Sequence, residues 1–259
     1  MRHGAALLAL ALLATPVGAL GQGLAERITG GGDGVVRMSF PARPGVEICD
    51  QGIRLFGERK GRSGTGWREQ ACAPGPVVVE VLVRGGEVRD VELLSRGDPR
   101  APGARDLATV GASEAVAFLL ASARGGAGGR GVEEAVLPAM MADAREVWRE
   151  VLAIAEDGRV GADVRRTSLF WLGQEAAEAA TAGLAGVAAD EGEDQEVRTA
   201  AIFALSRRPE AEGVPILMEL ARTAREPATR RAAFFWLAQS RDERVAPFFR
   251  SVLLGNRGG

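Results

Sequence analysis

One pattern of apolar and polar residues recurs through the second half of the chain. Its clearest copies span residues 163–174, 196–207 and 228–239, and a weaker copy begins at Gly131. Within each copy the apolar side chains lie three or four residues apart, which places them on one face of a helix. A fixed period of 32 or 33 residues is typical of a helical solenoid, in which each repeat buries its apolar face against its neighbours.

The second helix of each repeat follows the same period. Apolar residues recur there in two series, which are Leu152, Leu184, Leu217 and Phe249, and Ala155, Val187, Leu220 and Val252. A further helix is predicted after Ser113, in the same register, and we expect it to be a leading half-repeat that caps the array. Residues 113–254 therefore predict about four helix pairs plus this half-repeat, followed by a flexible tail at 255–259.

The region before the repeats has a different pattern. Residues 20–97 contain short apolar runs with period-2 alternation between glycines and prolines, which predicts strands. The clearest pair is Val77–Arg84 and Glu87–Leu94, joined by Gly85-Gly86, which suits a two-residue hairpin. We expect a small antiparallel β domain here and a linker at residues 98–112. The predicted fold class is α+β, with a β domain followed by an all-α solenoid.

The first 19 residues have the pattern of a secretory signal peptide. A positively charged start is followed by the apolar run 5–15, and small residues end at Ala19. This run is too short to span a bilayer, and no later segment is apolar enough to do so. We expect cleavage after Ala19 and a secreted or periplasmic protein with no transmembrane segment. The alternative is a buried N-terminal helix.

The two cysteines, Cys49 and Cys72, are the only ones in the chain. In an oxidising compartment they are free to pair, and closing a loop of this length stabilises a fold by roughly 3 kcal/mol. The alternative is a metal site. Two cysteines do not complete a tetrahedral zinc shell without carboxylates, because the only histidine, His3, leaves with the signal peptide. We therefore predict a disulfide and no metal.

Composition excludes several classes of function. The formal net charge is −2, so no basic excess points to nucleic acid. Without histidine the mature chain cannot build a Ser-His-Asp or Cys-His arrangement. Lys60 is the only possible amine nucleophile, and it lies in a polar, glycine-rich segment. We expect a protein that is not an enzyme and needs no cofactor.

Two sets of equivalent positions are candidates for binding. Arg165, Arg198 and Arg230 recur at one helical position, where they either grip anionic ligands or tie each helix to groups in the neighbouring repeat. Trp171 and Trp236 are also equivalent, and either stack a sugar ring or fill gaps between repeats. We expect the structural role for the arginines and packing for the tryptophans.

A third candidate lies in the β region. The cationic loop 57–66 ends at Trp67 and contains four glycines. It is either a flexible arm for an anionic partner or an exposed connection between strands. Loops of this composition are commonly the latter.

The segment Glu196-Val-Arg-Thr-Ala-Ala-Ile-Phe-Ala-Leu205 resembles the first helix of HEAT-type α-solenoids, in the variety called phycobilisome-lyase-like HEAT repeats. With the signal peptide and the cysteine-containing β region, the chain resembles exported bacterial HEAT-repeat proteins. Pro138 and Thr229 depart from the repeat pattern. The resemblance implies a HEAT-like solenoid over residues 113–254 and does not specify an activity.

Three functions remain open. The first is a protein-interaction scaffold in the cell envelope or exterior, which binds a polypeptide on the solenoid surface. The second is a carbohydrate or peptidoglycan binder that uses Trp67 and exposed repeat tryptophans. The third, suggested only by the family name, is a lyase-like enzyme. Solvent exposure of Trp171 and Trp236 separates the first two.

Overall fold

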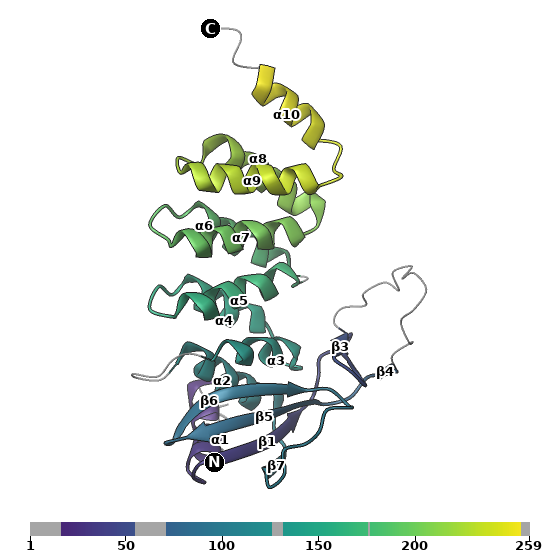
Figure 1. Cartoon of the computed structure of the whole chain (residues 1–259), viewed down its shortest axis with the longest axis vertical. Helices are drawn as coiled ribbons and strands as arrows, with labels where there is room; N and C mark the ends of the chain where they lie inside the picture. The colour runs from purple at the N-terminus through teal and green to yellow at the C-terminus, as the bar shows by residue number, and fades with distance from the viewer. Residues whose placement is uncertain (1–16, 55–70, 126–131, 176, 255–259) are drawn as a thin grey trace, which may run out of the picture.

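The computed structural model describes residues 17–54, 71–125, 132–175 and 177–254. It has the expected α+β architecture, in which a small sheet region is followed by a stack of helix pairs (Figure 1). Most of the predicted signal peptide, the loop 57–66 with Trp67, and the tail 255–259 lie outside the described residues.

The larger sheet has four strands in the order β6-β5-β1-β7. β5 (Val77–Arg84) and β6 (Glu87–Leu94) form the predicted hairpin, and φ is +63° at Gly85 and +73° at Gly86. Positive φ at both turn residues matches the two-residue turn that the sequence predicts. β1 (Gly34–Phe40) pairs antiparallel with the other edge of β5.

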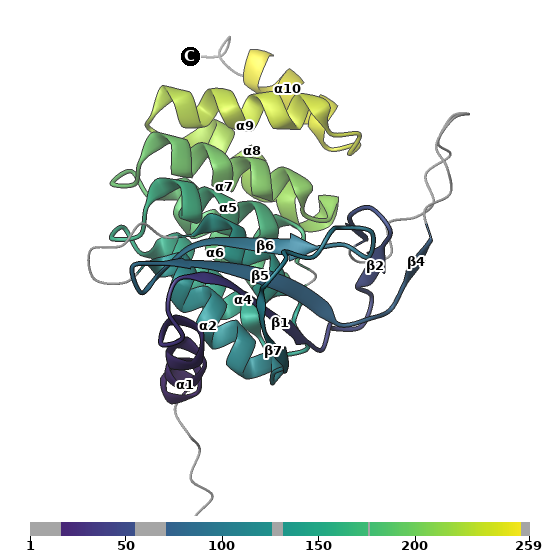
Figure 2. The same ribbon diagram turned by 60° about the horizontal axis from the view of Figure 1, so that its bottom comes forward.

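One face of this sheet is apolar and buried. The alternate valines of β5, together with three side chains of β1, lie in the core, and the seven residues are Val77, Val79, Val81, Val83, Val36, Met38 and Phe40. The sheet contacts η1 (Glu133–Ala135) and α3 (Val136–Met141). In Figure 2 it lies against the first helices of the stack.

A second, smaller sheet carries the disulfide. β2 (Glu47–Cys49) is its central strand and pairs antiparallel with β3 (Ile53–Arg54) and β4 (Cys72–Ala73). Cys49 and Cys72 are partners in the β2–β4 register and form a disulfide. The predicted pairing is confirmed, and it leaves neither thiol for a metal.

α1 (Val17–Thr29) is a helix in a region where the sequence predicts strands from residue 20. Leu24 and Ile28 lie four residues apart, are fully buried, and face α2 (Ala112–Arg124), which packs against α1. This spacing is helical, but it covers too few apolar residues to stand out from the sequence. The helix spans Ala19, and cleavage after that residue stays a prediction.

The linker predicted at residues 98–112 contains a strand. β7 (Arg105–Thr109) pairs in parallel with β1 at the edge of the larger sheet, so the sheet is not purely antiparallel. No side chain of β7 is fully buried. Because the strand has no apolar alternation, its pairing with a segment about 70 residues earlier leaves no local signal in the sequence.

Beyond α2, four helix pairs stack along one direction (Figure 1). The pairs are η1 and α3 with α4 (Val147–Glu156), α5 (Ala162–Gly173) with α6 (Glu178–Ala189), α7 (Gln195–Arg207) with α8 (Glu210–Thr223), and α9 (Pro227–Gln239) with α10 (Val245–Leu254). α2 is the expected leading half-repeat. The first helices α5, α7 and α9 lie side by side.

The sheet region is joined to the solenoid by backbone pairing. The amide of Arg43 donates to the carbonyl of Met141 at 2.8 Å, and the amide of Asp143 donates to the carbonyl of Pro41 at 2.9 Å. Arg43 also forms an ion pair with Glu175, after α5, at 2.9 Å. A single hydrophobic core runs from the sheet through the helices. The chain itself therefore covers the N-terminal end of the stack.

Candidate functional site

The arginines that recur in the first helices sit at the gaps between repeats. Arg165, at the start of α5, is 4% exposed. Its Nε donates to the carbonyl of Ala155 at 2.9 Å, and its two Nη atoms contact the two carboxylate oxygens of Glu193. Arg165 thus connects the end of α4 to the turn before α7, and its donors are occupied within the protein.

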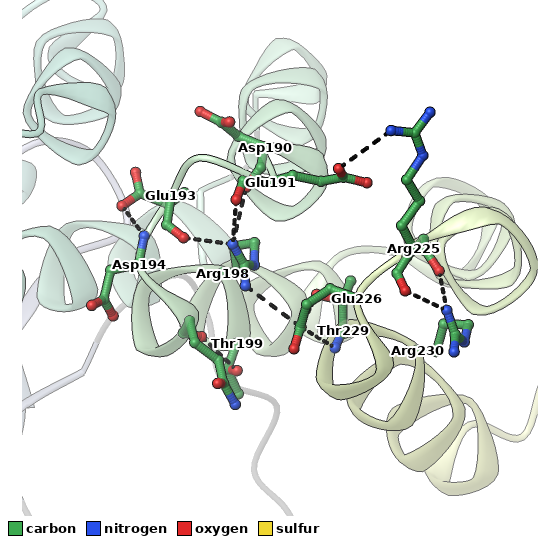
Figure 3. Close-up of polar contacts among 12 residues, drawn as sticks. Asp190, Glu191, Glu193, Asp194, Arg198, Thr199, Arg225, Glu226, Thr229 and Arg230 are labelled. Carbon is green, nitrogen blue, oxygen red and sulfur yellow. Dashed lines mark hydrogen bonds and ion pairs between the residues drawn. The ribbon is translucent and has the colours of Figure 1, made fainter.

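Arg198 repeats this arrangement one step along the stack (Figure 3). Its Nη1 donates to the carbonyls of Glu191 and Glu193 in the turn before α7, and its Nη2 lies 3.5 Å from Glu226 at the start of α9. The backbone amide of Thr229 is the largest cause that lowers the pKa of Glu226, and Arg198 also lowers it. A carboxylate held ionised beside the guanidinium makes this a structural pair.

A cavity of about 140 Å³ lies beside Arg198 and is lined in part by Arg225 and Glu191. Figure 3 shows the Arg225 side chain pointing towards Glu191, with 3.7 Å between the charged atoms. Each arginine at this cavity faces a carboxylate of the protein. The cavity therefore has no excess positive charge for an anionic ligand.

Arg230 is the third member of the series. It donates to the carbonyls of Ala224 and Arg225 at 2.6 and 2.7 Å. In the described part of the chain it meets no carboxylate, unlike Arg165 and Arg198. Each of the three arginines donates to a backbone carbonyl at the end of the preceding helix or in the turn that follows it, and they differ in the carboxylate that the next repeat supplies.

Aromatic rings form a second series across the same helices. Phe170 of α5 stacks on Phe203 of α7 with 6.1 Å between centroids, and Phe203 lies 4.9 Å from Trp236 of α9. Trp171 meets Phe170 edge-on, at 4.8 Å. We call these four residues the aromatic ridge. Phe170 is 38% exposed and the other three are partly buried.

The repeat pattern indicates the tryptophans of this ridge as binding candidates, but the structure adds the phenylalanines. Phe170, Phe203 and Phe235 occupy the same position of three successive repeats, and Phe235 is 57% exposed. The recurrence of phenylalanine at this repeat position is the sequence feature that could have predicted the series. An aromatic residue that recurs on the polar side of a helix is not explained by packing in the core. Trp67, the third tryptophan candidate, is not among the described residues.

A buried arginine lies in the turn between α7 and α8. The side chain of Arg208 is 1% exposed. It donates to the hydroxyl of Thr181, to the carbonyls of Glu175 and Ala177, and to the carboxylate of Glu212. Hydrogen bonds from Thr181 and then Arg208 lower the pKa of Glu212. This network joins α6 to α8 and is complete without a ligand.

A groove of about 650 Å³ lies between α8 and α10, where the guanidinium of Arg222 sits 4.8 Å from the ring of Phe248. Within the described ranges, no three His, Cys, Asp or Glu side chains converge so as to hold a metal ion. In the same ranges, no helix combines the length and apolarity needed to cross a bilayer.

Comparison with known proteins agrees with the stacked architecture. The family described as HEAT repeats matches residues 150–238 and 186–257, which extend from α4 past α10. This part of the chain is therefore similar to HEAT repeats, a class of helical repeat that generally mediates contacts between proteins and is typically non-catalytic. Searches of curated proteins and of solved structures gave no match.

Proposed function

We propose that this protein is a non-enzymatic interaction scaffold of the cell envelope or exterior, which binds a polypeptide on the solenoid surface. The observation that carries the proposal is the aromatic ridge. Its rings cross three repeats and are held by contacts with one another, so they form a preformed surface. Aromatic anchors of this kind dominate the binding energy of protein interfaces.

Two carboxylates with shifted pKa values belong to structural ion pairs rather than to an acid–base site. The side chain of Arg159 is the main cause that lowers the pKa of Asp157 to about 2, and Arg244 has the same effect on Asp242. A general acid needs a pKa near the working pH. The pKa values of these two carboxyl groups are shifted in the opposite direction, so the groups stay ionised, as is typical of structural ion pairs.

Export is supported by two features. The N-terminal pattern with small residues up to Ala19 is that of a secretory signal peptide. The Cys49–Cys72 disulfide suits an oxidising compartment. N-terminal sequencing of the protein from the cell envelope or medium tests this part, and a chain that begins at Leu20 is the expected result.

Carbohydrate binding is the weaker alternative. Trp171 and Trp236 are partly buried, and both contact the rings of Phe170, Phe203 or Phe235. A sugar-binding tryptophan needs an open ring face, whereas these two rings are partly covered by the neighbouring phenylalanine rings. The contacts therefore favour packing and a polypeptide partner.

The test compares two variants in their native cells. Phe170→Ala removes the most exposed ring of the ridge, and Trp148→Ala removes a partly exposed ring of α4, outside the ridge. Affinity capture after mild crosslinking should recover a protein partner with wild-type chain and with Trp148→Ala, and lose most of it with Phe170→Ala. Equal recovery with all three excludes the ridge, and retention on purified peptidoglycan that Phe170→Ala abolishes favours the alternative.

A further inference from the structure

The C-terminal end of the stack differs from every gap between repeats. At one position of the second helices, Val187 and Leu220 are 5% and 6% exposed, whereas Val252 of α10 is 39% exposed. At the next position, Ala188 and Ala221 are 0% and 3% exposed, whereas Leu253 is 76% exposed. In α6 and α8 these positions are covered by the repeat that follows. In α10 no described residue covers the same surface.

The first helix of the last repeat shows the same lack of a partner. Arg231 is the equivalent of Arg166, which pairs with Glu196 of α7, yet Arg231 is exposed and makes no ion pair within the described residues. Phe235 is the equivalent of Phe170, which stacks on Phe203. We call this set the open end, and its members are the partly buried Arg230 and the exposed Arg231, Phe235, Val252, Leu253 and Leu254.

The contacts between successive repeats inside the stack indicate what kind of helix the open end binds. Glu193 pairs with Arg165, and Phe203, ten residues later, stacks on Phe170. Glu226 pairs with Arg198, and Trp236, also ten residues later, contacts Phe203. Each docked helix therefore brings a carboxylate at its start and an aromatic ring ten residues further on.

From these relationships we infer that the open end docks a helix of another protein, with acidic residues at its N-terminus and an aromatic residue about ten positions later. The carboxylates meet Arg230 and Arg231, the ring stacks on Phe235, and the apolar face of the docked helix covers Val252 and Leu253. Phe235 of the open end lies 5.0 Å from Trp236 of the aromatic ridge, but the other members of the open end lie outside the ridge. The inference goes beyond the proposed function because it concerns the end of the stack and not the ridge.

A second copy of the chain is a poorer occupant. The open end contains two arginines and no carboxylate, and two copies joined end to end would bring like charges together. At the other end of the stack, α1 packs on α2 and the sheet contacts α3, so that end is not free to dock on α10. The segment Gly255-Asn-Arg-Gly-Gly259 contains no acidic or large apolar residue.

The test uses a peptide with the sequence of residues 193–207, stapled through the exposed positions 195 and 199 to hold it helical. Fluorescence anisotropy should show binding to the full chain. Replacing Glu196 of the peptide by Arg should weaken binding at least about fivefold, and Arg231→Glu in the protein should do the same. Combining the two changes should restore affinity, since the charges are then exchanged.

Three variants of the protein define the surface. Phe235→Ala and Leu253→Ser should each weaken peptide binding, whereas Arg96→Glu, an exposed arginine of the sheet region, should leave it unchanged. Circular dichroism verifies that each variant is folded. Absence of peptide binding, or binding that ignores Arg231→Glu and Leu253→Ser, overturns the inference. Sedimentation velocity that shows a dimer dissociated by Leu253→Asp also overturns it, because the occupant is then a second copy.

Discussion

Arg165 and Glu193 form an ion pair that is 5% and 12% exposed, between helices that belong to different repeats. The guanidinium uses both Nη atoms on the carboxylate and Nε on the carbonyl of Ala155. On the same helix, Arg166 pairs with Glu196, but these side chains are 36% and 72% exposed. The two neighbouring pairs therefore separate the effect of burial from that of charge.

Glu193→Gln should destabilise the chain strongly, because it leaves the charge of Arg165 buried and uncompensated. Removing one partner of a buried pair costs about 3–5 kcal/mol. Glu196→Gln, the matched control, should change the free energy of unfolding by at most about 1 kcal/mol, since the pair is solvated. Urea denaturation measures both. Equal losses for the two variants would contradict a structural role for the buried arginine.

The pairing of Asp242 with Arg244 predicts a dependence of stability on pH. The hydrogen bond from the Arg244 side chain is the largest cause that lowers the pKa of Asp242, from about 3.8 to about 2. A carboxyl group with a lowered pKa stabilises the fold above its unfolded pKa, and this stabilisation disappears as the pH falls from about 4 to about 2. The difference in stability between wild type and Asp242→Asn should shrink over that range.

Urea midpoints at several pH values between 6 and 2 give this difference. Arg244→Gln removes the donor that lowers the pKa of Asp242, so the difference between wild type and this variant should shrink over the same range. A constant difference between wild type and Asp242→Asn would show that the pair does not stabilise the fold through ionisation.

Gly213 and Gly186 are both helical, and they should respond oppositely to alanine. A Cβ on Gly213 of α8 would lie 2.2 Å from the carbonyl oxygen of Leu205, so α7 and α8 would have to separate. Overpacking of this kind costs about 1–3 kcal/mol. At Gly186 of α6 a Cβ meets nothing within 4 Å, and alanine should stabilise the helix by about 0.5–1 kcal/mol. Thermal unfolding of the two variants checks the opposite signs.

The disulfide should stabilise the small sheet and not the solenoid. Cys49 and Cys72 close a loop of 23 residues between β2 and β4, and losing it should cost roughly 3 kcal/mol. In the double variant Cys49→Ser and Cys72→Ser, hydrogen exchange should increase in β2 and β4 and stay low in α5 and α7. Faster exchange throughout the helices would show that the small sheet supports the whole stack.

Several features of the chain follow from local pattern. The 32- and 33-residue period predicts the helix pairs, and alternation with Gly85-Gly86 predicts the β5–β6 hairpin. The two cysteines without histidine predict the Cys49–Cys72 bond. Each signal reflects a contact whose geometry is set by residues close in the chain or by a repeated register.

The sequence by itself determined that this is a repeat solenoid behind a small disulfide-bonded sheet. Only the tertiary structure decided that β7 joins β1, that Arg208 is buried, and that Arg165 meets Glu193. It also decided that Leu253 is exposed while its equivalents are covered. The reason is physical: burial and pairing of a charged or edge residue depend on which segments lie across the gap, and local periodicity does not carry that information.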